Sequence, residues 1–137
     1  NPLNYNVLEG SYSSDPCDGT KRIIEFRELV QAYYDAGISI IMDVVYNHVN
    51  GLSGSNFDTL MPYYYFRYDD ATGSASNGSG CGNETASERA MFRKFMIDST
   101  TFWTETYHLG GFRFDLMGCH DIETMNKVAE EVHKINQ

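Results

Sequence analysis

The sequence has few basic residues and no long hydrophobic run. Lys and Arg total 10 against 19 Asp and Glu, so the formal net charge is −9. A chain without a basic stripe is not expected to bind nucleic acid or an anionic membrane surface. No apolar run approaches the roughly 20 residues of a membrane-spanning helix. Neutral polyols remain compatible ligands, because they need hydrogen bonds and flat aromatic faces, and the chain has ten tyrosines.

Cysteine is also scarce. Cys17, Cys81 and Cys119 lie far apart and form no C-x-x-C pair. This spacing excludes a zinc knuckle and a dense disulfide framework, so we expect three free thiols. The chain opens with neither a starting Met nor a signal peptide, and its ends do not indicate a cellular location.

Hydrophobic periodicity predicts helices over residues 21–36, 87–109 and 121–135. Gly37 is expected to end the first, Ser87 to cap the second, and Asp121 to cap the third. Short strands are expected over 38–45 and 112–116. Residues 1–20 are predicted to be a loop. Residues 49–86, rich in Gly, Ser and aromatics, are predicted to form a long, ordered, functional loop.

The alternation of helices and strands predicts a parallel α/β fold. The strand at 38–45 is apolar on both faces, which is typical of a strand buried on both sides. Two parallel strands cannot bury their own edges, and a complete (β/α)₈ barrel needs about 250 residues. We therefore predict that residues 1–137 are a section of a (β/α)₈ TIM barrel, poorly folded and inactive in isolation.

Polar residues follow both predicted strands. Asp43 and His48 lie at and beyond the end of the first, and Arg113 and Asp115 lie at the end of the second. Ligands of parallel α/β proteins bind at this end of the strands. Arg113 and Asp115 are two apart and share a face, so the guanidinium is expected to keep the carboxylate ionised, as a nucleophile must be. A purely structural ion pair is the alternative.

These residues carry a resemblance. Residues 43–48 (DVVYNH) and 111–115 (GFRFD) resemble two signature regions of the α-amylase superfamily of glycoside hydrolases (family 13). Residues 1–7, 9–13, 80–84 and 116–118 are similar to type I pullulanases, while many α-1,4-acting enzymes carry Lys-His where this chain has Gly118-Cys119. Two departures are Asn1, where Asp is usual, and Cys119, where an aliphatic residue is common.

The resemblance implies strands 3 and 4 of the barrel, with 49–86 as a long active-site loop after strand 3. It implies a retaining enzyme that hydrolyses α-1,6 branch linkages in an α-glucan such as pullulan, starch or glycogen, the only partner expected. Asp115 would be the nucleophile and Arg113 its orienting partner. Substrate contacts would come from Asp43, His48 (as a hydrogen-bond donor), Tyr46 (as a stacking face), Asn83 and His120.

No cofactor is predicted. Asn47 matches a calcium ligand of α-amylases, but companion ligands are missing, so calcium is left as an option for a longer protein only. Three other functions stay open: an isoamylase-like enzyme, an α-1,4-acting relative, and a non-catalytic glucan-binding relative. A metallohydrolase using Asp43, His48 and His120 is disfavoured, because no H-x-H or H-E-x-x-H pair is present.

Overall fold

The computed structural model describes residues 1–136. Along the chain it has the 3₁₀ turn η1 (Gly10–Tyr12), helix α1 (Gly19–Asp35), strand β1 (Ile41–Val44), the short helix α2 (Asn56–Leu60), helix α3 (Ala90–Tyr107), strand β2 (Gly111–Phe114), the 3₁₀ turn η2 (Met117–Cys119) and helix α4 (Ile122–Ile135). The predicted α/β class and order of elements are confirmed.

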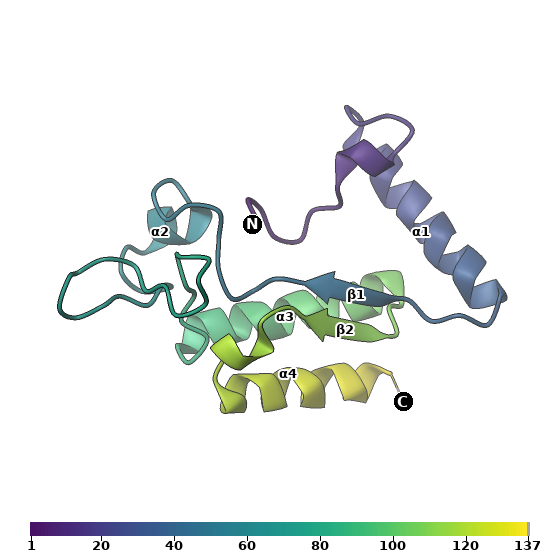
Figure 1. Ribbon diagram of the computed structural model, residues 1–137. Helices are drawn as coiled ribbons and strands as arrows, with labels where there is room; N and C mark the ends of the chain where they lie inside the picture. The colour runs from purple at the N-terminus through teal and green to yellow at the C-terminus, as the bar shows by residue number, and fades with distance from the viewer. Residues whose placement is uncertain (137) are drawn as a thin grey trace.

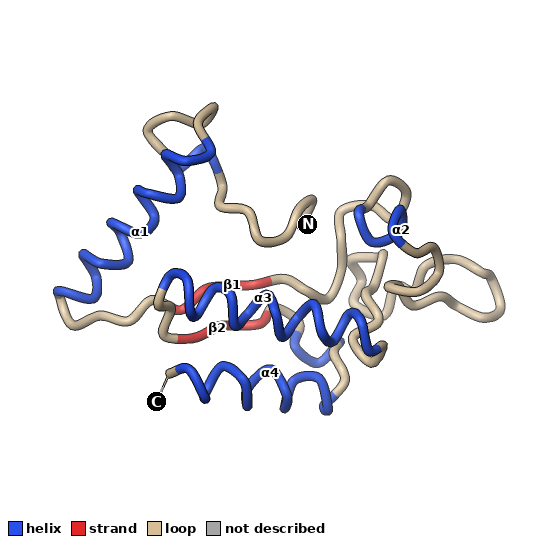
Figure 2. The backbone as a smooth tube through the Cα atoms, turned by 180° about the vertical axis from the view of Figure 1, so that it is seen from behind, coloured by secondary structure: helices blue, strands red, loops and turns tan. Residues whose placement is uncertain are grey.

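The two strands form a parallel sheet in which Asp43 pairs with Arg113 and Val44 with Phe114. Helices α3 and α4 lie side by side along this sheet (Figures 1 and 2). The sheet's covered face supplies Val44 and Phe114 to a core that also contains Phe92 and Met96 of α3. Alternation along each strand therefore sends Asp43 and Arg113 to the opposite, uncovered face.

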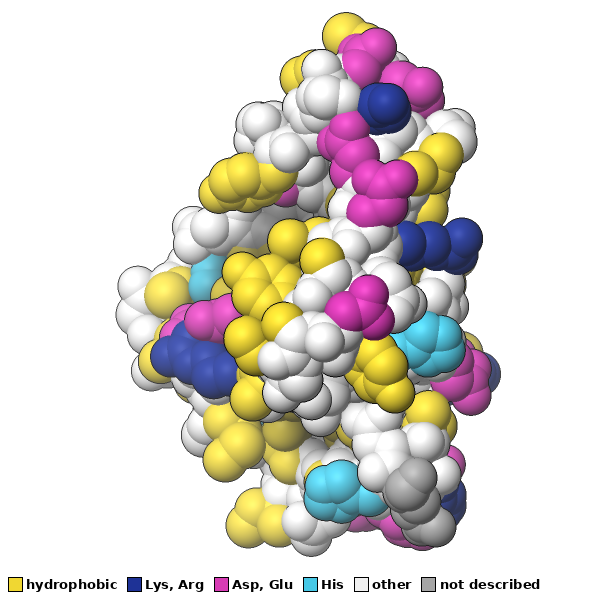
Figure 3. Space-filling view, turned by 90° about the vertical axis from the view of Figure 1, so that its right-hand side faces the viewer, with side chains coloured by type: hydrophobic (Ala, Val, Ile, Leu, Met, Phe, Trp, Pro, Cys, Tyr) yellow, Lys and Arg dark blue, Asp and Glu magenta, His cyan; other side chains and the backbone are white. Residues whose placement is uncertain are grey.

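The prediction that the first strand is buried on both sides is wrong for this chain. Ile41 is 65% exposed and Ile38 is 52% exposed, while Val44 is buried. The reason is that β1 pairs only with β2 among residues 1–136. In Figure 3, hydrophobic side chains gather in the middle of the face shown. Exposed apolar surface of this kind is typical of a face that contacts other protein.

Helix termini follow the predicted signals in two of three cases. Asp121 caps α4 by accepting a hydrogen bond from the Thr124 N–H, and Gly37 adopts a positive φ of 74° after α1. The prediction for Ser87 is wrong, because α3 begins at Ala90 after Arg89. The buried Ser87 hydroxyl instead accepts from the Asp121 N–H at 2.9 Å and donates to its carboxylate at 2.8 Å. Ser87 thus stabilises the N-terminus of α4 through its cap residue.

The long loop is ordered. It contains α2 and three isolated antiparallel bridges, which pair His48 with Glu84, Phe66 with Thr85, and Tyr68 with Ala75. Tyr65 and Phe66 are buried in the main core, whereas Tyr63 is 71% exposed. The loop therefore folds back on the segment that follows β1.

A second core cluster joins α1 to the end of α3. It consists of Val30, Trp103, Tyr107 and Leu109, with Phe26 packed against it. His108 takes a left-handed conformation and ends α3. All three cysteines are free thiols, also as predicted. None of the helices within residues 1–136 is long and apolar enough to cross a membrane.

Candidate active site

The predicted site residues from the two strands meet at one end of the sheet. Asp43 and Arg113 are register partners in the parallel ladder. Asp115 directly follows β2, and its backbone N–H donates to the Val44 carbonyl at 2.9 Å, which extends the pairing by one residue. Because Asp115 is two residues from Arg113, both side chains lie on the uncovered face.

Arg113 links two carboxylates. Its Nη1 lies 2.9 Å from Asp43 Oδ1 and 3.0 Å from Asp115 Oδ1. The hydrogen bond and charge of Asp43, and then the charge of Asp115, raise the pKa of the guanidinium above its already high ordinary value. One permanent cation thus fixes the positions of two anions. The predicted Arg113–Asp115 contact is present, and Asp43 shares it.

His48 is tied to the same strand end through its neighbour Asn47. The Asn47 side chain is buried and donates from Nδ2 to the backbone carbonyl of Asp115 at 2.7 Å. Its Oδ1 therefore turns toward His48, whose Nδ1 lies 2.6 Å away. Asn47 is a strut between the residue after β2 and the imidazole.

This geometry determines the tautomer of His48. Asn47 Oδ1 can only accept, so Nδ1 carries the proton in a neutral imidazole. Burial lowers the pKa of His48, while the nearby Asp115 carboxylate opposes that shift. Donation to a sugar from Nε2, the predicted role, therefore requires the imidazolium form. Nε2 lies 2.8 Å from Asn1 Oδ1, which also can only accept, so a neutral imidazole donates at Nδ1 and only the imidazolium donates to both amide oxygens.

Tyr46 does not offer the predicted stacking face. It is 3% exposed, its ring stacks on Tyr5 with centroids 5.4 Å apart, and its hydroxyl lies 2.6 Å from Ser99 Oγ. Its ring lies on the core side of the sheet, in edge or tilted contact with Phe95 and Phe114. Side chains alternate along the extended chain at the end of β1. Asp43 therefore points to the uncovered face, and Tyr46, three residues later, points to the core.

His120 is buried rather than presented to a ligand. It is 7% exposed, meets Phe114 edge-on, and neither ring nitrogen has a hydrogen-bond partner in the part of the chain that the structure describes. Burial, with the nearby Arg67 cation, lowers its pKa to about 4. In this arrangement the ring packs inside the fold, and the predicted substrate contact of His120 stays a prediction.

Asn83 lies beside the His48 segment. It has a left-handed φ of 49°, and its Nδ2 lies 3.4 Å from the Val49 carbonyl that accepts from it. It is half-buried. This position borders the site without a direct contact to Asp43 or Arg113 among the hydrogen bonds of residues 1–136.

The sequence did not predict three contacts that position the site residues. The first is made by Asn47, which the sequence indicated only as a possible calcium ligand. The Tyr5 hydroxyl donates to the His48 carbonyl at 2.9 Å, and Glu84 pairs with His48 through the backbone. The Tyr5–His48 contact joins residues that are 43 positions apart, and the His48–Glu84 bridge joins residues that are 36 apart. No local sequence pattern could therefore have predicted either contact. No cluster of three or more metal-ligating side chains is present in the described chain.

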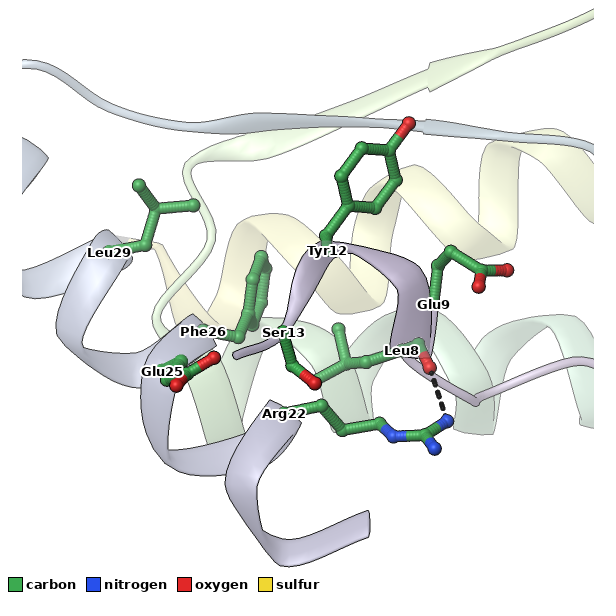
Figure 4. A pocket seen from close by; sticks show the side chains of 8 residues that line it. All are labelled: Leu8, Glu9, Tyr12, Ser13, Arg22, Glu25, Phe26 and Leu29. Atoms are coloured by element: carbon green, nitrogen blue, oxygen red, sulfur yellow. Dashed lines mark hydrogen bonds between the residues drawn. The ribbon is translucent and has the colours of Figure 1, made fainter. Parts of the chain in front are cut away.

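A separate groove of about 380 Å³ lies between η1 and α1 (Figure 4). Its lining includes none of the predicted site residues. The Arg22 guanidinium donates to the Leu8 carbonyl at 3.0 Å, and Glu25 accepts from the Ser14 N–H at 2.9 Å, so both side chains bond the chain itself. The strand ends therefore remain the candidate site.

Parallel strands with ion-paired carboxylates at their carboxyl ends are typical of α/β enzymes. No family model matches the chain. Curated relatives do: the chain is 43% identical to the pullulanase of Bacillus subtilis over 134 residues, which is 98% of this chain and 18% of that protein.

Solved structures agree. A Paenibacillus barengoltzii pullulanase in complex with maltohexaose and α-cyclodextrin matches with a TM-score of 0.95, 48% identity, and coverage of 99% of this chain and 21% of that one. An Anoxybacillus pullulanase complexed with maltotriose matches with a TM-score of 0.93, 50% identity, and coverage of 98% and 19%. The resemblance to type I pullulanases is thereby confirmed over nearly all of this chain, which spans about a fifth of the length of these relatives.

Proposed function

We propose that the protein containing this chain is a retaining glycoside hydrolase that cleaves α-1,6-glucosidic branch linkages in α-glucans. In this proposal β1 and β2 are strands 3 and 4 of a (β/α)₈ barrel, residues 1–137 are a section of its catalytic domain, and residues 49–86 are its long active-site loop. The observation that carries it is Arg113, which holds Asp43 and Asp115 at the carboxyl ends of two adjacent parallel strands.

Asp115 is the proposed nucleophile. In a retaining reaction one carboxylate attacks the anomeric carbon to form a covalent glycosyl intermediate, which water then hydrolyses. Arg113 contacts Oδ1 of Asp115, so Oδ2 is available for attack. The side chain of Asp115 is 34% exposed, which leaves it accessible while fixed. Arg113 orients the carboxylate and supplies the positive charge beside it.

Asp43 and His48 are the proposed contacts to the sugar at the cleavage point. The Asp43 side chain is 66% exposed on the open face and keeps acceptor capacity beyond its bond to Arg113. His48 is held at Nδ1 by Asn47, so Nε2 is the ring nitrogen proposed to meet a sugar hydroxyl, which would replace its 2.8 Å contact with Asn1 Oδ1. Asn83 is proposed as a border contact. Tyr46 is not carried into this proposal, because its ring packs against Tyr5 and its hydroxyl lies 2.6 Å from Ser99 Oγ in the core. His120 stays a proposed contact, because neither ring nitrogen has a partner among the described residues.

The open face itself supports the barrel assignment. Ile41 lies on the same side of β1 as Asp43 and is 65% exposed. An apolar residue alternating with a polar strand-end residue is what a barrel interior requires, where branched side chains fill the layers below the site. We propose that the general acid comes from another strand of that barrel, since retaining hydrolysis needs a second carboxyl group about 5–5.5 Å from the first.

The test compares the full-length protein with Asp115→Asn on pullulan and on linear amylose. We expect maltotriose release from pullulan, reduced roughly a thousandfold or more in the variant, because the amide cannot form the glycosyl ester. Asp35→Asn, at an exposed carboxylate at the end of α1, is the matched control and should keep full activity.

Other outcomes separate the alternatives. Preferential cleavage of amylose would assign the protein to the α-1,4-acting relatives. Binding of glucan without cleavage by the wild type would identify a non-catalytic relative. An active Asp115→Asn variant would refute the nucleophile assignment.

A further inference from the structure

Glu84 is a buried carboxylate in the long loop for which the proposed mechanism has no use. It is 4% exposed. Its Oε2 accepts from the Ser76 hydroxyl at 2.6 Å, and its Oε1 accepts from the backbone N–H of Ser79 at 2.5 Å. A Cβ on Gly78 would lie 3.1 Å from Oε1, so the glycine leaves the space that the carboxylate occupies. The side chain therefore closes the turn at 76–84.

The backbone of Glu84 is the centre of three extended segments. On one side Glu84 forms an antiparallel bridge with His48. On the other side its carbonyl accepts from the Arg67 N–H at 2.9 Å. The residue after it continues both contacts, since Thr85 bridges Phe66 and donates from its hydroxyl to the Tyr46 carbonyl at 2.6 Å. Residues 83–85, called the central segment below, are thus held between the two neighbouring segments.

This central segment sets the position of residues 46–49, which include His48 of the candidate site. The Thr85 N–H donates to the Asn47 carbonyl at 3.1 Å, and the Val49 N–H donates to the Asn83 carbonyl at 3.4 Å. Asn47 in turn contacts both the Asp115 carbonyl and His48 Nδ1. A chain of direct contacts therefore runs from the Glu84 carboxylate to the imidazole and to the backbone of the proposed nucleophile.

We propose that Glu84 is a positioning residue for the active site. By closing the turn at 76–84 it holds residues 83–85 against residues 46–49 and so fixes the orientation of Asn47 and His48. The inference rests on the proposed function for its catalytic consequence, and on the contacts above for its structural one.

The first test replaces Glu84 in the full-length protein and measures pullulan cleavage. Glu84→Ala removes both acceptors, and we expect kcat to fall roughly tenfold to a hundredfold with KM within about threefold, because displaced catalytic groups act on the chemical step. Glu84→Gln should stay within about threefold of wild type, because its amide oxygen can accept from Ser79 while the Ser76 hydroxyl turns to accept from the amide nitrogen.

Glu130→Ala is the matched control, since Glu130 is exposed on α4 and pairs with Lys134. It should not change kcat. A Glu84→Ala variant within twofold of wild type would overturn the proposal. So would a Glu84→Gln variant as impaired as Glu84→Ala, because charge rather than hydrogen bonding would then matter.

Amide hydrogen exchange supplies a readout that does not depend on activity. Ser76→Ala removes one of the two bonds without deleting the carboxylate. We expect faster exchange in peptides covering 76–85 and, as the decisive sign, also 46–50. If the wild type cleaves no glucan but residues 46–50 lose protection, the proposed function fails and the positioning role stands. If protection of 46–50 is unchanged in Ser76→Ala and in Glu84→Ala, the positioning role is wrong even in an active enzyme.

Discussion

Replacing Asn47 by alanine tests whether the site is held by the strut described above. Asn47 is 1% exposed, and its amide bonds the Asp115 carbonyl at 2.7 Å and His48 Nδ1 at 2.6 Å. Alanine leaves both groups buried without that partner. Each unsatisfied buried group costs about 1–3 kcal/mol, so the free energy of unfolding should fall by roughly 2–5 kcal/mol.

Urea unfolding of the full-length protein, followed by tryptophan fluorescence, measures this change. Asn56→Ala is the matched control, because Asn56 is exposed in α2, and it should shift the free energy of unfolding by less than about 0.5 kcal/mol. kcat on pullulan should fall in parallel for Asn47→Ala. A loss of stability no greater than that of the control would refute the strut, as would a fully active variant.

Two further predictions concern the end of the sheet near α4. Ser87→Ala should destabilise the protein by about 1–2 kcal/mol, because the buried hydroxyl bonds both the N–H and the carboxylate of Asp121, and a shift no larger than that of the exposed Ser53→Ala in thermal unfolding would contradict this. The pKa of His120 is lowered to about 4 by burial, so its contribution to stability is complete above its ordinary pKa near 6.5 and is lost as the pH falls toward 4, by about 3 kcal/mol. Wild type should therefore lose more stability than His120→Phe between pH 6.5 and 4 in urea titrations, and parallel pH profiles would show that His120 does not titrate as described.

The sequence was sufficient for the features that depend on local chemistry. The strand after Gly37, the αL end of α1 at that glycine, and the Asp121 cap follow from residue type and spacing, and the structure has all three. The contact between Arg113 and Asp115 follows from the two-residue period of a strand, and it is present. Local rules of this kind do not require knowledge of the rest of the fold.

The failures share a different cause. Ser87 has the composition of an N-cap, but Asp121, 34 residues away, competes for its hydroxyl and the helix begins later. Tyr46 was predicted to offer a stacking face to a sugar, yet tertiary packing against Tyr5 buries its ring. Burial and long-range pairing are set by the tertiary fold, so no local pattern could distinguish these residues from ligand contacts.

The proposed mechanism depends on a covalent bond between Asp115 and the sugar. The most direct measurement incubates the full-length protein with a fluorinated α-glucosyl fluoride, which slows hydrolysis of the glycosyl intermediate, and maps the labelled peptide by mass spectrometry. We expect a single glucosyl adduct on Asp115, absent from Asp115→Asn. An adduct on Asp43 or on any other carboxylate, or turnover of a good substrate with no adduct at all, would contradict it.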